Sequence, residues 1–409
     1  MSTTQTFAYT SRNSGGKLVR GRIEAPNETM VVSRLRTMGL SPVAIEVSAA
    51  GTGLRREISL PGFEKRVPLR DVAVMSRQLA TMVGAGLSLL RALTILTEQT
   101  ENATLAAALD GIRTDVERGS SLSEAVAKHE RIFPPIMIHL VRAGELGGFL
   151  DQSLESIAAT FEADVKLRAT ITSALTYPVI VLVIAIVSVI GMLVFIVPVF
   201  EKMFADLGGT LPLPTQILVT LSRHMVWIGP LLAGLALAAA LWWRSNGRTD
   251  EVRAVVDPLK FRMPVFGLLM RKVAIARFTR NFATMTGAGV PILRSLEIVG
   301  QTSGNWMIEQ ALLRVRDSVR AGSSVAGPLM SEPVFPAMVT QMIAVGEDSG
   351  SMETMLNKIA DFYEAEVQTT TESLTSLIEP LMIGVIGAII GSMIVALYMP
   401  MFTIYSEIQ

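Results

Sequence analysis

The sequence contains no cysteine among its 409 residues, and this absence removes several kinds of chemistry at once. A chain without cysteine has no disulfide bonds, no cysteine ligands for zinc and no thiol nucleophile. Histidine is almost as scarce, since His129, His139 and His224 are the three in the chain and lie far apart in sequence. The nucleotide-binding pattern GxxxxGK[ST] and the zinc-binding pattern HExxH are also missing. We therefore expect no catalytic site, no cofactor and no metal ion.

Charge is low and evenly balanced. Only 18% of the residues are charged, and 36 Lys and Arg match 36 Asp and Glu. A net charge of zero gives no indication of nucleic acid or of a strongly acidic partner. Residues 1–16 contain no apolar run, so we expect no secretory signal and infer that membrane insertion relies on internal spans.

Long uncharged runs are what the chain does have. No charged residue occurs in 169–200, which exceeds the roughly 20 apolar residues needed to cross a bilayer. The charged, amphipathic stretch from Gly147 leads into this run, which predicts one helix that leaves a soluble domain and enters the membrane. A similar stretch runs from Gly350 to Phe402. Residues 225–243 form a further uncharged span, with two tryptophans at one interface.

An internal repeat links the two halves of the chain. RQLATMVGAGLSLLRAL from Arg77 matches RNFATMTGAGVPILRSL from Arg280, 203 positions later. FPPIMIHLVRAGELGG from Phe133 matches FPAMVTQMIAVGEDSG from Phe335, 202 positions later. Because identities, glycines, prolines and the hydrophobic run keep register, we infer that a helical domain has been duplicated together with its attached span.

The sequence predicts a mainly α membrane protein with two homologous six-helix bundles, three transmembrane helices and a small N-terminal α+β segment. Helical periodicity, glycine stop signals and a capping box at Ser121 to Glu124 define the helices of the first copy. The expected order is an α+β segment (1–47), a linker (48–67), the first helical domain (68–170), span one (171–200), an extracytoplasmic loop (201–223), span two (224–243), a basic connector (244–270), the second helical domain (271–376), span three (377–402) and an extracytoplasmic tail (403–409).

The duplication constrains the topology. A domain followed by one span, repeated directly, would place the second domain across the membrane from the first, and the extra span at 225–243 returns the chain to the same side. Residues 244–280 contain nine Lys or Arg, whereas 201–223 contain two and 401–409 none. By the positive-inside rule, both helical domains are expected to be cytoplasmic.

Two matched corners are the most suggestive candidate sites, Gly144-Glu145 and Gly346-Glu347. We expect each glycine to end one helix in the left-handed conformation and each glutamate to lie near the start of the next helix, where it favours the helix dipole. Two interpretations stay open. The glutamates are caps that fix the turn, or the two corners form a contact surface for a cytoplasmic partner.

Other positions have simpler expected roles. Four glycines are expected in turns rather than in phosphate-binding loops: Gly84, Gly86, Gly287 and Gly289. Four prolines are expected to bend the spanning helices or to mark their ends: Pro178, Pro198, Pro380 and Pro400. Five carboxylates on the long helices are expected to be solvated or ion-paired rather than bridged by a divalent ion: Glu155, Glu162, Asp164, Glu364 and Glu366.

The chain resembles the polytopic inner-membrane platform protein of type IV pili and type II secretion systems. The resemblance rests on FAYTSRNSGGKLVRGRIEA near the N-terminus, the duplicated RQLATM motif, the AGELGG and VGEDSG corners, the LPLPT loop and the terminal YMPMF. It covers essentially the whole chain and does not decide between pilus assembly and protein secretion.

The resemblance implies a location in the bacterial cytoplasmic (inner) membrane and no catalytic activity. It further implies homo-oligomers and contacts with a cytoplasmic hexameric assembly ATPase, with pilin or pseudopilin subunits and with membrane alignment proteins, in addition to the lipid bilayer. The expected function is to couple the ATPase to the extraction and polymerisation of pilins. The alternative is a membrane channel or carrier, against which the scarcity of charged residues in the spans counts, since Glu379, near the start of span three, is the one charged residue within the expected bounds.

Overall fold

The computed structural model divides into two compact units, residues 1–65 and 66–409. The residues that it describes are 5–12, 18–25, 28–37, 41–47, 67–206, 211–247, 249–264 and 266–407. Three sequence predictions fall outside the described residues: a hairpin turn at Asn13 to Gly16, a helix cap at Asn27 and nearly all of the linker.

The first unit is a three-stranded antiparallel sheet with one helix. Strand β1 (Gln5–Arg12) lies between β2 (Leu18–Ala25) and β3 (Ser41–Val47), and helix α1 (Glu28–Thr37) connects β2 to β3. Val31 and Leu35, one helical turn apart, are buried and define the face of α1 that packs inward.

The second unit contains the two copies of the repeat, each with six helices in the same order. The helices of the first copy are α2 (Leu69–Gly84), α3 (Leu89–Gln99), α4 (Ala103–Glu117), α5 (Leu122–Ala127), α6 (Pro135–Gly147) and α7 (Leu150–Gly191). Those of the second copy are α11 (Phe266–Gly287), α12 (Ile292–Thr302), α13 (Trp306–Arg320), α14 (Ala326–Met330), α15 (Ala337–Asp348) and α16 (Met352–Glu407). The connector forms one further helix, α10 (Asp250–Arg262).

Equivalent helices of the two copies begin at equivalent positions because the side chains that cap them are repeated. The side chain of Asn102 accepts hydrogen bonds from two backbone N–H groups at the start of α4, and Asn305 does the same for α13. The hydroxyl of Ser121 accepts from the Glu124 N–H at the start of α5, as expected of the capping box. These bonds satisfy N–H groups that have no partner within their own helix.

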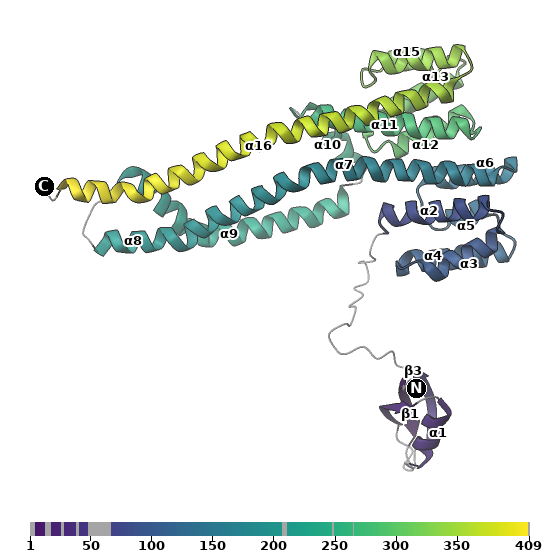
Figure 1. Ribbon diagram of the computed structural model, residues 1–409, viewed down its shortest axis with the longest axis horizontal. Coiled ribbons are helices and arrows are strands. Elements are labelled where there is room, and N and C mark those ends of the chain that lie inside the picture. The colour runs from purple at the N-terminus through teal and green to yellow at the C-terminus, as the bar shows by residue number, and fades with distance from the viewer. Residues whose placement is uncertain are drawn as a thin grey trace. The chain divides into compact units, whose positions relative to one another are not determined.

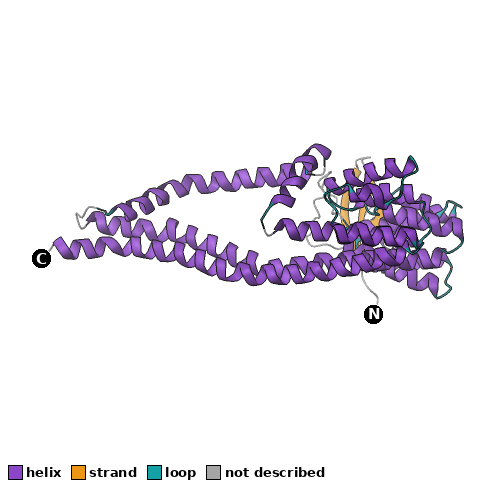
Figure 2. Cartoon of the chain, turned by 90° about the horizontal axis from the view of Figure 1, so that it is seen from above, coloured by secondary structure: helices purple, strands orange, loops and turns teal. Residues whose placement is uncertain are grey.

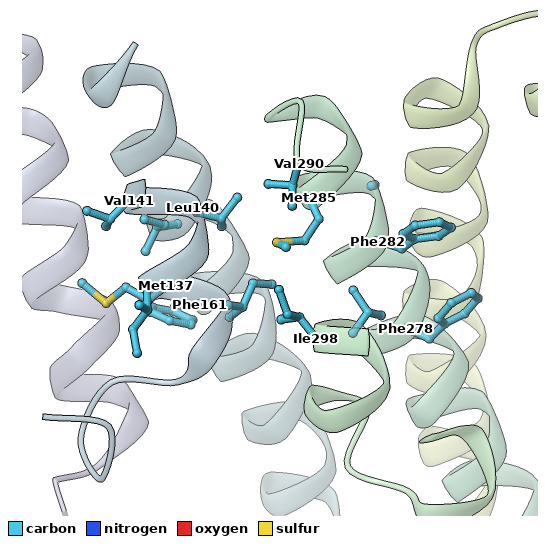
Figure 3. Close-up of a cluster of buried hydrophobic side chains, with 14 of the residues drawn as sticks. Met137, Leu140, Val141, Phe161, Phe278, Phe282, Met285, Val290 and Ile298 are labelled. Carbon is cyan, nitrogen blue, oxygen red and sulfur yellow. The ribbon is translucent and has the colours of Figure 1, made fainter. Parts of the chain in front are cut away.

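The two copies share one hydrophobic core. Buried side chains of α6 and α7 and those of α11 and α12 form a single cluster, which Figure 3 shows in close-up. Phe161 of α7 and Ile298 of α12 lie in the middle of it, with Phe278 and Phe282 of α11 farther into the second copy. The clustered residues are fully or almost fully buried, so the contact between the copies has the character of a domain core rather than of a loose surface contact.

Three helices are long and apolar enough to cross a membrane. Helix α7 continues through a π-helical turn, η1 (Met192–Ile196), into α8 (Val197–Asp206); α9 (Leu213–Asn246) returns, and α16 is the third. Figure 1 shows α7 and α16 extending from their bundles in the same direction. The prediction of a mainly helical membrane protein with a duplicated helical unit and three spans is therefore confirmed.

Helix extends farther than the sequence indicated at both ends of the spans. Residues 213–223 of the expected loop belong to α9, and α16 continues to Glu407 through most of the expected tail. The sequence predicts a loop there from Gly208, Gly209, Pro212 and Pro214. However, Pro212 is the N-cap of α9 and Pro214 lies in its first turn, where a missing N–H costs no helical hydrogen bond.

The three spans pack together at the end distant from the bundles. A separate buried cluster there contains Leu193 and Val197 of the first long helix, Leu218 and Val219 of α9, and Met393, Ala396 and Leu397 of α16. Figure 2 shows α9 diverging from the other two helices toward the bundles. The apolar side chains in the diverging parts are exposed within the monomer, as lipid-facing side chains would be.

Candidate functional site

The corner glycines lie inside helices and do not end them. Gly144 belongs to α6, which ends at Gly147, and Gly346 belongs to α15, which ends at Asp348. At the two corners the glycines with positive φ are Gly148 (73°) and Gly350 (67°), so the expectation that Gly144 and Gly346 adopt the left-handed conformation is wrong. Both corner sequences offer several glycines, and only the helix geometry selects which one turns the chain.

Gly144 and Gly346 instead allow close approach between consecutive helices. A Cβ atom on Gly144 would lie 2.5 Å from Ser153 Oγ of α7, and one on Gly346 would lie 3.1 Å from Met352 Cα of α16. Each glycine therefore lets the helix before the corner pack tightly against the long helix after it.

Glu145 and Glu347 cap a short helix other than the one expected. Glu145 accepts hydrogen bonds from the backbone N–H groups of Leu122 and Ser123 at the start of α5, the second at 3.1 Å. Glu347 accepts from Val325 and Ala326 at the start of α14, at 2.7 and 2.9 Å. The capping interpretation describes this geometry, although the expectation that each glutamate lies at the start of the following long helix is wrong.

The expected turn glycines follow the first helix of each copy. Gly84 and Gly287 are the last residues of α2 and α11, and Gly86 and Gly289 have φ of 87° and 69° in the turns that follow. This left-handed backbone strains residues that carry a Cβ, which gives the GAG sequence a physical reason in both copies.

An arginine clamp joins the first helix of each bundle to its long helix. Arg77 of α2 makes a bidentate pair with Glu162 of α7, with both N–O distances 2.7 Å, and also contacts Glu155. Hydrogen bonding to Arg77 is the main cause that lowers the pKa of Glu162 below its ordinary value, although burial opposes it. The carboxylate is therefore held in its charged form.

The second copy carries the same clamp at the equivalent position. Arg280 of α11 bonds Glu364, Asn357 and Asp361 of α16 at 2.9, 3.0 and 2.6 Å. Arg280 is the first residue of the second RQLATM-like motif, as Arg77 is of the first. No local pattern in the sequence identifies these arginines as ion-pair partners. The signal that could have identified them is that an arginine and a glutamate recur together in both copies, Arg77 with Glu162 and Arg280 with Glu364.

The five carboxylates that the sequence singled out on the long helices are ion-paired. Besides Glu155, Glu162 and Glu364, Asp164 pairs with Arg168 and Arg277, and Glu366 pairs with Lys272. Among the described residues, no group of three or more His, Asp or Glu side chains is arranged to hold a metal ion. These ion pairs connect each long helix to neighbouring helices of the bundles.

All four prolines lie within helices, so of the two expected roles, bending a helix or marking its end, the second does not describe Pro178, Pro380 and Pro400. Pro178 lies in α7, Pro380 and Pro400 in α16, and Pro198 in the first turn of α8. The π-helical turn η1 directly precedes Pro198, as is typical where a proline interrupts the backbone ladder.

Two hydroxyls of α9 satisfy carbonyl groups that the far prolines leave without a donor. In the π-helical turn the N–H of Val197 bonds the carbonyl five residues before it, Met192 O. With the same spacing, the donor for Leu193 O would be residue 198, which is a proline and has no N–H. Ser222 Oγ donates to Leu193 O instead. In α16 the residue four before Pro400 is Ala396, and Thr215 Oγ1 donates to its carbonyl. Span two is thus fastened to both long helices where their backbones are interrupted.

The comparisons with known proteins agree with the duplicated pattern. The family described as "Type II secretion system (T2SS), protein F" matches residues 75–198 and again 278–400, and the "Type II secretion system protein F, N-terminal domain" matches residues 1–46. The two long matches start 203 positions apart and end 202 apart, which is the offset of the repeat.

Similar curated proteins extend over nearly the whole chain. A "Type IV pilus assembly protein PilC" of Myxococcus xanthus is 40% identical over 99% of this chain and 96% of its own length. The protein of the same name in Thermus thermophilus is 42% identical over 98% of this chain and 99% of its own length. A "Type II secretion system protein F" of Vibrio cholerae is 30% identical over 96% of this chain and 97% of its own length.

Proposed function

Because the chain belongs to the type II secretion system protein F family, we propose that it is the non-enzymatic platform of a type IV pilus or type II secretion machine. In this role it couples a cytoplasmic assembly ATPase to the extraction and polymerisation of pilin or pseudopilin subunits. The observation that carries the proposal is helical continuity: α7 with η1 and α8, and α16 alone, each run from a bundle through a membrane span.

The clamps supply the mechanical link that such coupling needs. Arg77 and Arg280 join the first helix of each bundle to the long helix of that bundle. A displacement of either bundle is therefore transmitted to a span by packing, by ion pairs and by unbroken helix rather than through a loop.

We place both bundles in the cytoplasm of a bacterium and the platform in its inner membrane. Residues 244–280 are rich in Lys and Arg, whereas residues 201–223 and 401–409 contain few or none. This difference supports the orientation through the positive-inside rule. On this side the bundles reach a hexameric ATPase, while the exposed apolar faces of the spans are available to pilin helices, alignment proteins or a second copy of the chain.

Pilus assembly is the favoured system. The two relatives above that are named for pilus assembly are 40% and 42% identical, against 30% for the relative named for type II secretion. Deleting the gene from its own bacterium should abolish surface pili while pilin precursor and ATPase persist in the cell, and the wild-type gene should restore them. Unchanged pili together with lost protein secretion would assign the chain to the secretion system, and no change in either would overturn the proposal.

The non-enzymatic role has its own test. Purified protein in liposomes is expected to hydrolyse no ATP by itself and to raise the turnover of the assembly ATPase when the two are combined. Solute flux into liposomes that contain this protein alone would instead indicate a channel or carrier.

A further inference from the structure

A cavity of about 620 Å³ lies between the two copies, in the size range of small-ligand sites. Helices α7, α10, α11 and α16 contribute to its wall. It extends along α7 to Arg168, the last charged residue before the first span, and it includes Gly247, which directly follows the helix of span two. The cavity therefore opens at the level where the two spans leave the bilayer.

Its lining is more cationic than anionic. Five Lys or Arg and three Asp or Glu side chains line the cavity. Three of these cations are ion-paired with carboxylates of their own: Arg253 with Glu309 at 2.7 Å, Lys260 with Asp257 at 2.8 Å, and Arg280 with Glu364 and Asp361. The other two, Arg168 and Arg277, share the carboxylate of Asp164.

That shared carboxylate leaves a positive charge uncompensated. Arg168 Nη2 lies 2.9 Å from one oxygen of Asp164, and Arg277 Nε lies 2.8 Å from the other. In the described part of the chain, Asp164 is the one polar partner of the Arg277 guanidinium, whose side chain is only 22% exposed. Burial, and secondarily the charge of Arg168, lower the pKa of Arg277, while Asp164 opposes them. Two guanidinium groups thus face one carboxylate in a partly desolvated wall.

The arginine pair is not a requirement of the repeated bundle. By the offset of the repeat, Arg277 corresponds to Val74 in the first copy, and Arg168 corresponds to Thr370 in the second. By contrast, Arg77 and Arg280, which hold the bundles together, occur in both copies. Among the described residues, two arginines share one carboxylate at this junction, where α7 of the first copy meets α11 of the second.

We propose that this cavity binds a phosphate group through Arg168 and Arg277. Paired guanidinium forks match the oxygens of a phosphate in charge and in geometry, and a phosphate would neutralise the charge that Asp164 leaves over. The phosphate comes from an anionic phospholipid in the adjoining leaflet or from a soluble phosphate compound. The position of Arg168 at the start of the span suits a lipid headgroup.

Two binding measurements on the purified full-length protein distinguish the sources. In the lipid arm, detergent-solubilised protein is titrated with phosphatidylglycerol or phosphatidylcholine, and bound lipid is counted by native mass spectrometry. In the soluble arm, inorganic phosphate or pyrophosphate is added without lipid, and the thermal midpoint is measured. Each is repeated with Arg168→Gln/Arg277→Gln, with Arg168→Lys/Arg277→Lys and with Arg113→Gln, a matched loss of an ion-paired arginine on α4.

A lipid source is supported if the wild-type protein retains phosphatidylglycerol in preference to phosphatidylcholine. This retention should weaken at least about tenfold in the double Gln variant, and less in the double Lys variant. Stabilisation by phosphate or pyrophosphate with the same order of variants supports the site with a soluble source. Arg113→Gln is expected to behave as wild type. Equal lipid retention for both headgroups with no phosphate effect, or equal binding by wild type and the double Gln variant, would overturn the proposal. The wild-type headgroup preference can be measured even if a variant fails to fold.

Discussion

Glu145 and Glu347 hold matching positions, and each carboxylate binds two backbone N–H groups of a neighbouring short helix. Glutamine in either place keeps the shape of the side chain but removes the charge and one acceptor oxygen. Glu145→Gln and Glu347→Gln should each reduce the free energy of unfolding by about 1–3 kcal/mol. Thermal unfolding in one detergent measures the loss.

The control is Glu130→Gln, which alters an exposed glutamate beyond α5 and should change the free energy of unfolding by less than about 0.5 kcal/mol. An equal, small effect of all three would contradict the capping role.

His139 gives the contact between the copies a dependence on pH. Burial, and secondarily the charges of Arg294 and Arg142, lower its pKa below the ordinary value, while Glu297 opposes them. Its Nε2 lies 3.2 Å from Arg294 Nη2 of α12, and since a guanidinium only donates, this nitrogen must be unprotonated.

Because the folded pKa of His139 is lower than the unfolded one, the unfolded chain binds more protons as the pH falls through the ordinary histidine range. The stability that His139 contributes is thus present above that range and lost below it. Thermal midpoints measured between about pH 8 and pH 5 should fall more steeply for wild type than for His139→Gln. Parallel curves would show that His139 does not sense pH.

At the scale of elements, the prolines near the far face serve as attachment points for span two. Ser222 and Thr215 donate to the carbonyl groups of Leu193 and Ala396, which Pro198 and Pro400 deprive of a helical donor. Ser222→Ala together with Thr215→Val should leave both carbonyls unsatisfied in a buried, apolar contact and cost about 1–3 kcal/mol per site.

The expected result is a lower thermal midpoint and faster proteolysis between α8 and α9. The control Thr220→Val removes an exposed hydroxyl that bonds only within its own helix. If Thr220→Val destabilises the protein as much as the double substitution, the attachment is not specific.

The sequence allowed the elements to be predicted well but not their contacts. Hydrophobic periodicity and glycine or proline punctuation placed the six helices of the first copy, and the repeat extended them to the second. The AGELGG sequence does not reveal that Gly144 lies within a helix and packs against Ser153, whereas Gly148 turns the chain. The partners of Glu145, Arg77 and Arg277 lie 22 or more positions away, and no local pattern specifies them.

At the scale of the whole molecule, the two copies meet within one chain. Thr160 Oγ1 of α7 lies 3.0 Å from Thr284 Oγ1 of α11. Since the chain has no cysteine, Thr160→Cys/Thr284→Cys introduces the one possible disulfide, and its sulfurs need only a small adjustment to bond.

Oxidation of this variant should join the two copies within a single polypeptide, so that the protein stays monomeric on a non-reducing denaturing gel and mass spectrometry finds the linked peptides. The single variants Thr160→Cys and Thr284→Cys control for chance pairing. Covalent dimers formed by the double variant but not by the single ones would show that the shared core assembles between chains instead.

Helix α16 runs without a break from its bundle into its span, and we expect it to carry motion from one to the other. The most direct test of this coupling is the count of surface pili on cells whose platform carries a Gly-Ser-Pro-Gly insertion between Ser376 and Leu377, two exposed residues where α16 approaches its span. The same insertion in the turn after Gly119 is the control, because that turn lies outside the long helices. Membrane amounts and ATPase co-purification should match wild type for both. We expect the α16 insertion to abolish pili and the control insertion to retain them. Normal pili on cells with a broken α16 would show that motion does not travel through this helix.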